Sequence, residues 1–233
     1  MRVVYNDALT FDPASKKGGV RANFRFRSVA RAPQNKNLQL LTNELIYMKE
    51  NEDIVLDKLS FADYFTSAAF FVVRESEGPN ILDDLAYGRQ DARTEAEAGD
   101  ASKIPAVGQS YVSNLKAKGF DGQEIVALAS IEAFGTVWDP KRRDTSKFPK
   151  LDNFYYKQLL TSGSDVVLQR ELTSDAELKA VVEKFAQDQK AYHDAFGQAF
   201  IKLTNLGHDE ETLTNVENLL EDHPYKKFIH QYY

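Results

Sequence analysis

The chain has 233 residues and a mass of 26.4 kDa, enough for one large domain or two small ones with a sizeable core. Its formal net charge of −6 lacks the basic excess of nucleic-acid-binding proteins, so we expect no nucleic-acid partner. The absence of cysteine excludes disulfides, zinc–thiolate sites, iron–sulfur clusters and cysteine nucleophiles. All four histidines lie after residue 192, so any imidazole chemistry has to come from that end of the chain.

Apolar residues at helical spacing dominate the chain, whereas strand-like alternation is nearly absent, and this predicts an all-α fold. Ser60 and Asp121 are candidate N-caps, and Gly119 is a candidate C-cap. Two polar segments, 86–108 and 136–151, are expected to be long loops. We expect one helix with Leu38, Leu41, Leu45 and Met48 on a single face, followed by helices over 61–73, 111–118, 124–134, 153–160, 175–186, 189–206 and 209–221.

Targeting signals are not evident in the printed sequence. No apolar run approaches the 18 residues that a transmembrane helix needs, and no signal peptide is recognisable. The chain opens on Met1-Arg2-Val3-Val4-Tyr5 without a capping residue, as though a helix were entered midway. We therefore expect that an N-terminal helix and a transit peptide are missing from the printed sequence.

Several motifs then occur in a specific order. They are Arg2 to Thr10 with Phe11-Asp12 and Gly18-Gly19, Leu59 to Asp63, Tyr87 to Asp91, Glu124 to Gly135, Leu151 to Tyr156, and Thr173 to Asp175. In this order the chain resembles the class I haem peroxidases of the plant-type superfamily, and most of all the ascorbate peroxidases. The resemblance covers about residues 1–207 and implies a haem-peroxidase-like helical domain that lacks the usual N-terminal helix, followed by an extension over 208–233.

The residues that the family needs for chemistry are replaced. The resemblance places Glu132 at the proximal histidine that ligates iron and Asn6 at the distal histidine that moves the peroxide proton. Tyr5 takes the place of the distal tryptophan, and Trp138 falls at the histidine that pairs with a haem propionate. The family's ascorbate-contacting arginine falls near Lys141. Four positions keep the family's residue: Arg2, Asn35 beside the distal base, Asp91, and Asp175 beside the proximal ligand.

These replacements predict that the haem pocket is degenerate. A carboxylate is a poor substitute for imidazole on haem iron, so we expect no haem, no metal site and no catalytic residue. Two buried carboxylates, Glu132 and Asp175, cannot both stay ionised at close range, so one protonates, one turns to solvent, or a cation fills the gap. The vacant pocket is expected to be smaller than in a haem-loaded relative, filled by Tyr5, Phe70, Phe134 and Trp138.

Three other interpretations stay open. A Tyr5 phenolate beside Arg2 could ligate haem as in catalases. Glu132 and Asp175 could hold a divalent cation. A working peroxidase could use unusual ligation through Glu132 or Tyr5. The basic run Lys141 to Arg143 is read as a solvated loop, with an acidic partner or lipid headgroups as the alternative.

The end of the chain has a different composition. Tyr225, Phe228, Tyr232 and Tyr233 lie within the last nine residues, and they either fold back on the domain or anchor the chain in a partner's groove. We therefore predict a non-catalytic pseudoenzyme that serves as a structural or accessory subunit of a larger organellar assembly, with a peroxidase-like paralogue as one candidate partner. By family habit, the mitochondrion is favoured over the chloroplast.

Overall fold

The structure is a computed structural model that describes residues 1–51, 59–105, 110–134, 149–161 and 168–214. Within these ranges the chain is helical, and extended residues pair only in two isolated bridges, Asp12–Lys17 and Tyr87–Thr214. The predicted all-α fold is therefore confirmed. No helix in these ranges is both long and apolar enough to cross a membrane.

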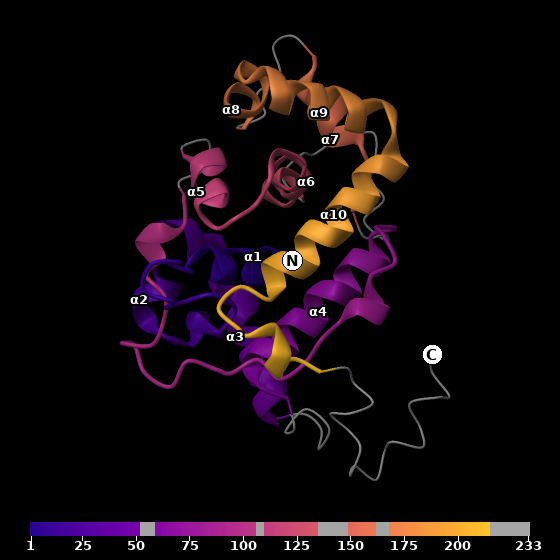
Figure 1. The fold of residues 1–233 in the computed structure, drawn as a ribbon. Coiled ribbons are helices and arrows are strands. Elements are labelled where there is room, and N and C mark those ends of the chain that lie inside the picture. The colour runs from indigo at the N-terminus through magenta and orange to yellow at the C-terminus, as the bar shows by residue number, and fades with distance from the viewer. Residues whose placement is uncertain (52–58, 106–109, 135–148, 162–167, 215–233) are drawn as a thin grey trace, which may run out of the picture.

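The ten described helices surround one core. Helix α10 runs through the molecule, from α7, α8 and α9 at one end to α1 and α4 at the other, and α6 packs along it (Figure 1). Helix α3 packs on α4, away from α6. The bounds are α1 (Arg2–Leu9), α2 (Arg27–Ala30), α3 (Gln39–Asn51), α4 (Phe61–Glu75), α5 (Tyr111–Ala117), α6 (Gly122–Ala133), α7 (Phe154–Leu159), α8 (Gln169–Ser174), α9 (Ala176–Gln187) and α10 (Gln189–Thr204).

The helix ends follow local capping chemistry. The Ser60 hydroxyl accepts the Asp63 N–H at the start of α4, and Asp121 and Glu124 form a reciprocal capping box at the start of α6. After α5, Gly119 has a φ of +88°, a left-handed conformation that glycine adopts without strain. The longer helices therefore begin and end close to the predicted residues. Helices α2 and α8 were not predicted, because four and six residues are too few to show a period.

The predicted helix over 209–221 is wrong in its described part. Residues Glu210–Thr212 form only a 3-10 turn, Leu213 is extended, and Thr214 pairs with Tyr87 through backbone hydrogen bonds of 2.7 and 2.8 Å. A ring nitrogen of His208 lies 2.6 Å from the Val20 carbonyl oxygen. Residues 208–214 therefore pack on the domain, because its backbone offers them hydrogen bonds that a helix would forfeit. Residues 215–221 lie outside the described ranges.

The apolar face of α10 is buried, whereas the predicted apolar face of α3 is not. Tyr192, Phe196 and Phe200 of α10 are fully buried. On α3 the buried side chains are Thr42 and Lys49, whereas Leu41 and Met48 are 50% and 41% exposed. Leu38 and Leu45 are only partly buried against the core. The helix is thus turned so that its apolar residues divide between the core and solvent.

A buried ion pair joins the beginning of α4 to the end of α10. Arg89 is 1% exposed, and its Nη1 lies 3.0 Å from Oδ1 of Asp63 in the first turn of α4. The same guanidinium donates to the carbonyl oxygens of Ala86 and Thr204 and to Oδ1 of Asn205. With each of its three nitrogens donating, Arg89 holds the loop around it between two helices that are distant in sequence.

Replacing Arg89 is expected to destabilise the fold strongly. Arg89→Met leaves the Asp63 carboxylate buried without its cation, and we expect a loss of about 3–5 kcal/mol in the free energy of unfolding. Urea denaturation followed by circular dichroism measures it. The matched control is Lys190→Met in the exposed Lys190–Asp194 pair of α10, for which we expect a change below about 0.5 kcal/mol. Equal losses in the two variants would contradict this role for Arg89.

Candidate functional site

The first turn of α1 meets the last turn of α6 through one arginine. Nη2 of Arg2 lies 2.5 Å from Oε2 of Glu132, and Nη1 of Arg2 donates to the Glu132 carbonyl oxygen at 2.6 Å. The Glu132 side chain is 8% exposed and that of Arg2 is 25% exposed. Both residues were predicted from the sequence as pocket positions, but not as partners of each other. The structure brings them together across 130 residues of chain.

The charge on Glu132 is balanced by its neighbours. Burial raises the pKa of the Glu132 carboxyl, and the Arg2 guanidinium opposes that rise, as does the nearby Tyr5 hydroxyl. The cation beside Glu132 is the chain's own Arg2. Such a pair stabilises the ionised form of Glu132 in a place that water does not reach freely.

Buried tyrosines surround the ion pair. Tyr5 is fully buried, and burial together with the Glu132 carboxylate raises its pKa well above the usual value. Arg2 lowers this pKa only as a minor contribution, so the ionised phenolate considered from the sequence is disfavoured. Tyr111 donates its hydroxyl to the Ile125 carbonyl oxygen of α6 at 3.0 Å. Tyr155 is buried, and Glu132 contributes to the upward shift of its pKa.

Tyr111 and Tyr155 were missed as site residues. Each lies in a run with helical apolar spacing, which predicts core packing and does not show what a hydroxyl at the buried end will meet. The only signal available was that both residues are tyrosine at a core position, since a buried phenol usually finds a polar neighbour.

Asn6, on α1, is buried and contacts Asn35. Nδ2 of Asn6 donates to Oδ1 of Asn35 at 2.7 Å, and Nδ2 of Asn35 donates to the Val29 carbonyl oxygen at 2.8 Å. The contact between the distal position and Asn35, which the resemblance implied, is therefore formed with an amide in place of an imidazole. The next residue, Asp7, accepts the N–H groups of Ala22 and Asn23, and its burial raises its pKa to about 7.

Two other positions at which the chain keeps the family's residue accept backbone N–H groups at the starts of helices. Asp175 is exposed and is the N-cap of α9, where its Oδ1 accepts the N–H groups of Glu177 and Leu178. The predicted close pairing of Asp175 with Glu132 is therefore corrected: Asp175 is bound to its own helix, and Glu132 to Arg2. Asp91 accepts the N–H groups of Phe61 and Ala62 at the start of α4.

The remaining predicted residues lie either in the core or outside the residues that the structure describes. Phe70 is buried with its ring centroid 5.5 Å from that of Phe200, and Phe134 packs partly buried against the core. Trp138, Lys141, the basic run 141–143, and Tyr225, Phe228, Tyr232 and Tyr233 lie outside the described residues.

The residues present do not fit a haem iron held in the family's manner. The carboxylate at the proximal position is engaged by Arg2, and the amide at the distal position has no proton equilibrium near neutrality. In the described part of the chain, no three His, Asp or Glu side chains gather as a metal site would require. The geometry here is that of an internal bridge between two helices.

A family model and individual relatives both identify this chain as similar to peroxidases. A family model described as peroxidase matches residues 1–188. The chain is 28% identical over 222 residues to L-ascorbate peroxidase 1, cytosolic, of Oryza sativa subsp. japonica, covering 89% of this chain and 84% of that protein. It is also 28% identical over 218 residues to L-ascorbate peroxidase 5, peroxisomal, of Arabidopsis thaliana, covering 89% of this chain and 75% of the relative. A probable chloroplastic ascorbate peroxidase of the same rice is 27% identical over 240 residues, covering 89% of this chain and 65% of its own length.

Removing the arginine of the bridge is expected to destabilise the protein in a pH-dependent way. In Arg2→Met the buried Glu132 carboxylate loses the charge and the hydrogen bond of Arg2, which both lower its pKa, so its pKa rises further. A carboxyl whose pKa is raised on folding weakens the fold as pH rises above the unfolded value of 4.5. We therefore expect a loss of about 2–3 kcal/mol at pH 8 and a much smaller loss at pH 4.5, measured by urea denaturation.

The double variant Arg2→Met/Glu132→Gln is the control, because it removes both charges of this pair. It is expected to recover most of the loss at pH 8 and to show no difference between the two pH values that comes from this pair. A loss in Arg2→Met that is the same at pH 4.5 and pH 8 would show that the bridge is not electrostatic.

Proposed function

The chain belongs to the peroxidase family, and we propose that it is a non-catalytic, ascorbate-peroxidase-like member that serves as a structural or accessory subunit of a larger assembly. The observation that carries the proposal is the contact between Arg2 and Glu132. In the family's arrangement these positions face opposite sides of a haem. Here their charged atoms are 2.5 Å apart.

The spacing of the two helices argues against a haem between them. A flat macrocycle in van der Waals contact with both side chains would hold their atoms about 7 Å apart, twice the usual contact distance of 3.5–4.0 Å. Opening the bridge to that extent would separate the buried Glu132 carboxylate from Arg2, and breaking a buried ion pair is strongly unfavourable. This supports the prediction that haem binding has been lost.

The chemistry of the neighbouring groups points the same way. Peroxide activation needs a base that exchanges a proton near neutral pH, and the amide of Asn6 cannot do so. The competing hypothesis is a haem peroxidase with ligation through Glu132 or Tyr5. It is disfavoured because Glu132 is paired with Arg2 and because the raised pKa of Tyr5 keeps that phenol protonated.

The accessory role is proposed because the chain has the helical fold of its family while the resemblance places no imidazole at the two reactive positions. A domain of this kind can act through its surface. We propose other protein subunits as partners, with a peroxidase-like paralogue as one candidate, and a mitochondrial assembly as the first location to examine. The relatives compared above are named cytosolic, peroxisomal and chloroplastic.

Haem titration tests the loss of the cofactor. When hemin is added to the purified chain, we expect no saturable Soret band at one equivalent and no spectral change with peroxide. In Asn6→His/Glu132→His, which restores both imidazoles and frees Arg2 from its bridge, we expect a Soret band near stoichiometry. Asn6→Gln/Glu132→Gln is the matched control, since it alters the same positions without adding a ligand.

A stoichiometric Soret band in the unaltered chain, with spectral change on adding peroxide, would overturn the non-catalytic proposal in favour of unusual ligation. Glu132→Gln and Tyr5→Phe would then identify the ligand, because only the variant that removes it should lose the band.

The accessory role has its own test. On native gels of gently solubilised source cells, we expect an antibody to this chain to detect an assembly much larger than 26.4 kDa. A chain that runs only as a free monomer in every cell fraction would contradict the subunit role, whatever the outcome of the haem titration.

A further inference from the structure

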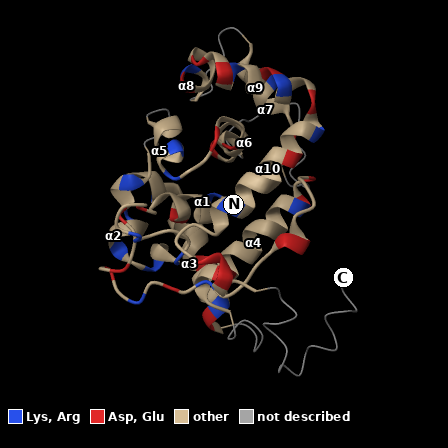
Figure 2. Cartoon of the chain, in the orientation of Figure 1, with Lys and Arg blue, Asp and Glu red and all other residues tan. Residues whose placement is uncertain are grey.

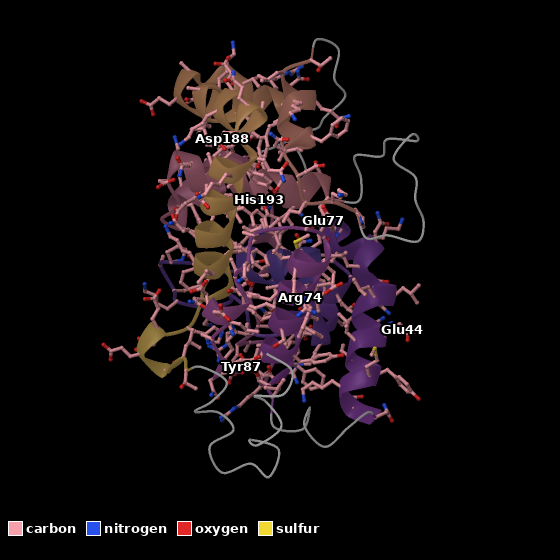
Figure 3. The ribbon with its side chains drawn as sticks, turned by 90° about the vertical axis from the view of Figure 1, so that its right-hand side faces the viewer. Glu44, Arg74, Glu77, Tyr87, Asp188 and His193 are labelled. Carbon is pink, nitrogen blue, oxygen red and sulfur yellow. The ribbon has the colours of Figure 1, made fainter. Side chains whose placement is uncertain are left out.

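Helix α3 presents an apolar stripe to solvent. Leu40, Leu41, Tyr47 and Met48 are 75%, 50%, 59% and 41% exposed, and their spacing places them on one side of the helix. They are four of the six large hydrophobic side chains exposed in the described part of the chain. Glu44 lies among them and points away from the body of the molecule (Figure 3). A cluster of this kind on one helix usually marks a contact surface.

The end of the described chain is anchored close to this helix. Thr214 pairs with Tyr87, and the next two residues, Gly88 and Arg89, donate their N–H groups to Asp63 in the first turn of α4. That turn begins at Phe61, whose ring centroid is 4.8 Å from Nζ of Lys49 on α3. Figure 3 shows Tyr87 at the end of the molecule where α3 also terminates. A short series of contacts thus leads from Thr214 to α3.

The segment beyond Thr214 is long enough to reach the stripe. It comprises residues 215–233, which is 19 residues and can extend over as much as about 60 Å. A tether of this length keeps its end at an effective concentration of the order of millimolar around the anchor. A surface on the same chain therefore competes favourably with a surface on another molecule.

The two surfaces match in chemistry. Residues 225–233 hold four aromatic side chains and two lysines, Lys226 and Lys227, and no acidic residue. The exposed charges of α3 are Glu44 and Glu50, because its one lysine, Lys49, is buried against the Phe61 ring. The helix thus offers apolar side chains and negative charge, whereas the segment offers aromatic side chains and positive charge.

Other surfaces for the segment, and other occupants of the stripe, are less favourable. As a surface for the segment, the face around α2 is basic, with Arg27 and Arg31 exposed (Figure 2), and it would repel Lys226 and Lys227. A bilayer with anionic lipids would be repelled by Glu44 in the middle of the stripe. A second copy packed symmetrically on α3 would bring Glu44 close to its own symmetry mate.

We propose that residues 225–233 bind across the exposed face of α3 in the same chain, with the aromatic rings on Leu40, Leu41, Tyr47 and Met48 and the lysines beside Glu44 and Glu50. This contact makes the end of the chain part of the domain and gives its aromatic residues a role other than anchoring in a partner. It does not rest on the proposed function, since it holds whether or not the chain binds haem.

The absence of cysteine makes the proposal directly testable in the full-length chain. Tyr232→Cys is combined with Leu41→Cys or with Met48→Cys, and disulfide formation under mild oxidation is followed on non-reducing gels and by mass spectrometry. We expect at least one pair to form an intramolecular disulfide in most molecules. The matched control pairs Tyr232→Cys with Leu160→Cys, a 40% exposed leucine at the end of α7, and should react at least fivefold more slowly.

Charge variants test the recognition. Glu44→Lys in the reactive pair is expected to slow cross-linking about fivefold, and Lys226→Glu/Lys227→Glu added to it should restore much of the rate. Disulfide-linked dimers as the main product would overturn the proposal in favour of a second copy. Equal rates for α3 and Leu160 positions, or no reaction at either, would overturn it as well. None of these outcomes depends on the haem titration or on the native gels.

Discussion

The ion pair between Arg2 and Glu132 is the contact on which this version of the fold depends. It joins the first turn of α1 to the last turn of α6, two helices that the family's arrangement places on opposite sides of a haem. Glu132 is 8% exposed and has the buried Tyr5, Tyr111 and Tyr155 near it, so its carboxylate has little water to replace Arg2. The burial that raises the pKa of Glu132 is also what makes Arg2 difficult to remove. Arg2 thereby joins the two helices through both the carboxylate and the carbonyl oxygen of Glu132.

The other polar contacts of the core are structural rather than chemical. Asn6 and Asn35 satisfy each other where an imidazole would otherwise be oriented. Asp91 and Asp175 receive the free N–H groups at the starts of α4 and α9. Arg89 and Asp63 hold α4 to α10. Each of these contacts is needed by the helical framework whether or not a reaction takes place, which explains how the framework can persist when the reactive imidazoles are absent.

The two sides of the molecule differ in charge and in exposed apolar side chains, and this difference affects what each side can bind. The side of α2 is basic, whereas α3 combines exposed leucine, tyrosine and methionine with glutamate. The proposed contact of residues 225–233 with α3 would cover most of the exposed apolar side chains. A partner subunit would then meet a surface that is largely charged. Binding to such a surface depends on electrostatic complementarity and weakens as salt increases.

The sequence alone determined the helices with clear local signals. Ser60 and the Asp121–Glu124 capping box set the starts of α4 and α6, and the spacing of Tyr192, Phe196 and Phe200 set the buried face of α10, because capping and periodicity act between residues a few positions apart. Its resemblance to the family also predicted which pocket residues are replaced. Only the tertiary structure decided that Glu132 pairs with Arg2 rather than with Asp175, that Tyr111 and Tyr155 join them, and that Leu41 and Met48 of α3 face solvent. Those outcomes depend on how helices far apart in the chain are packed and turned against one another, and no spacing within a single segment encodes that.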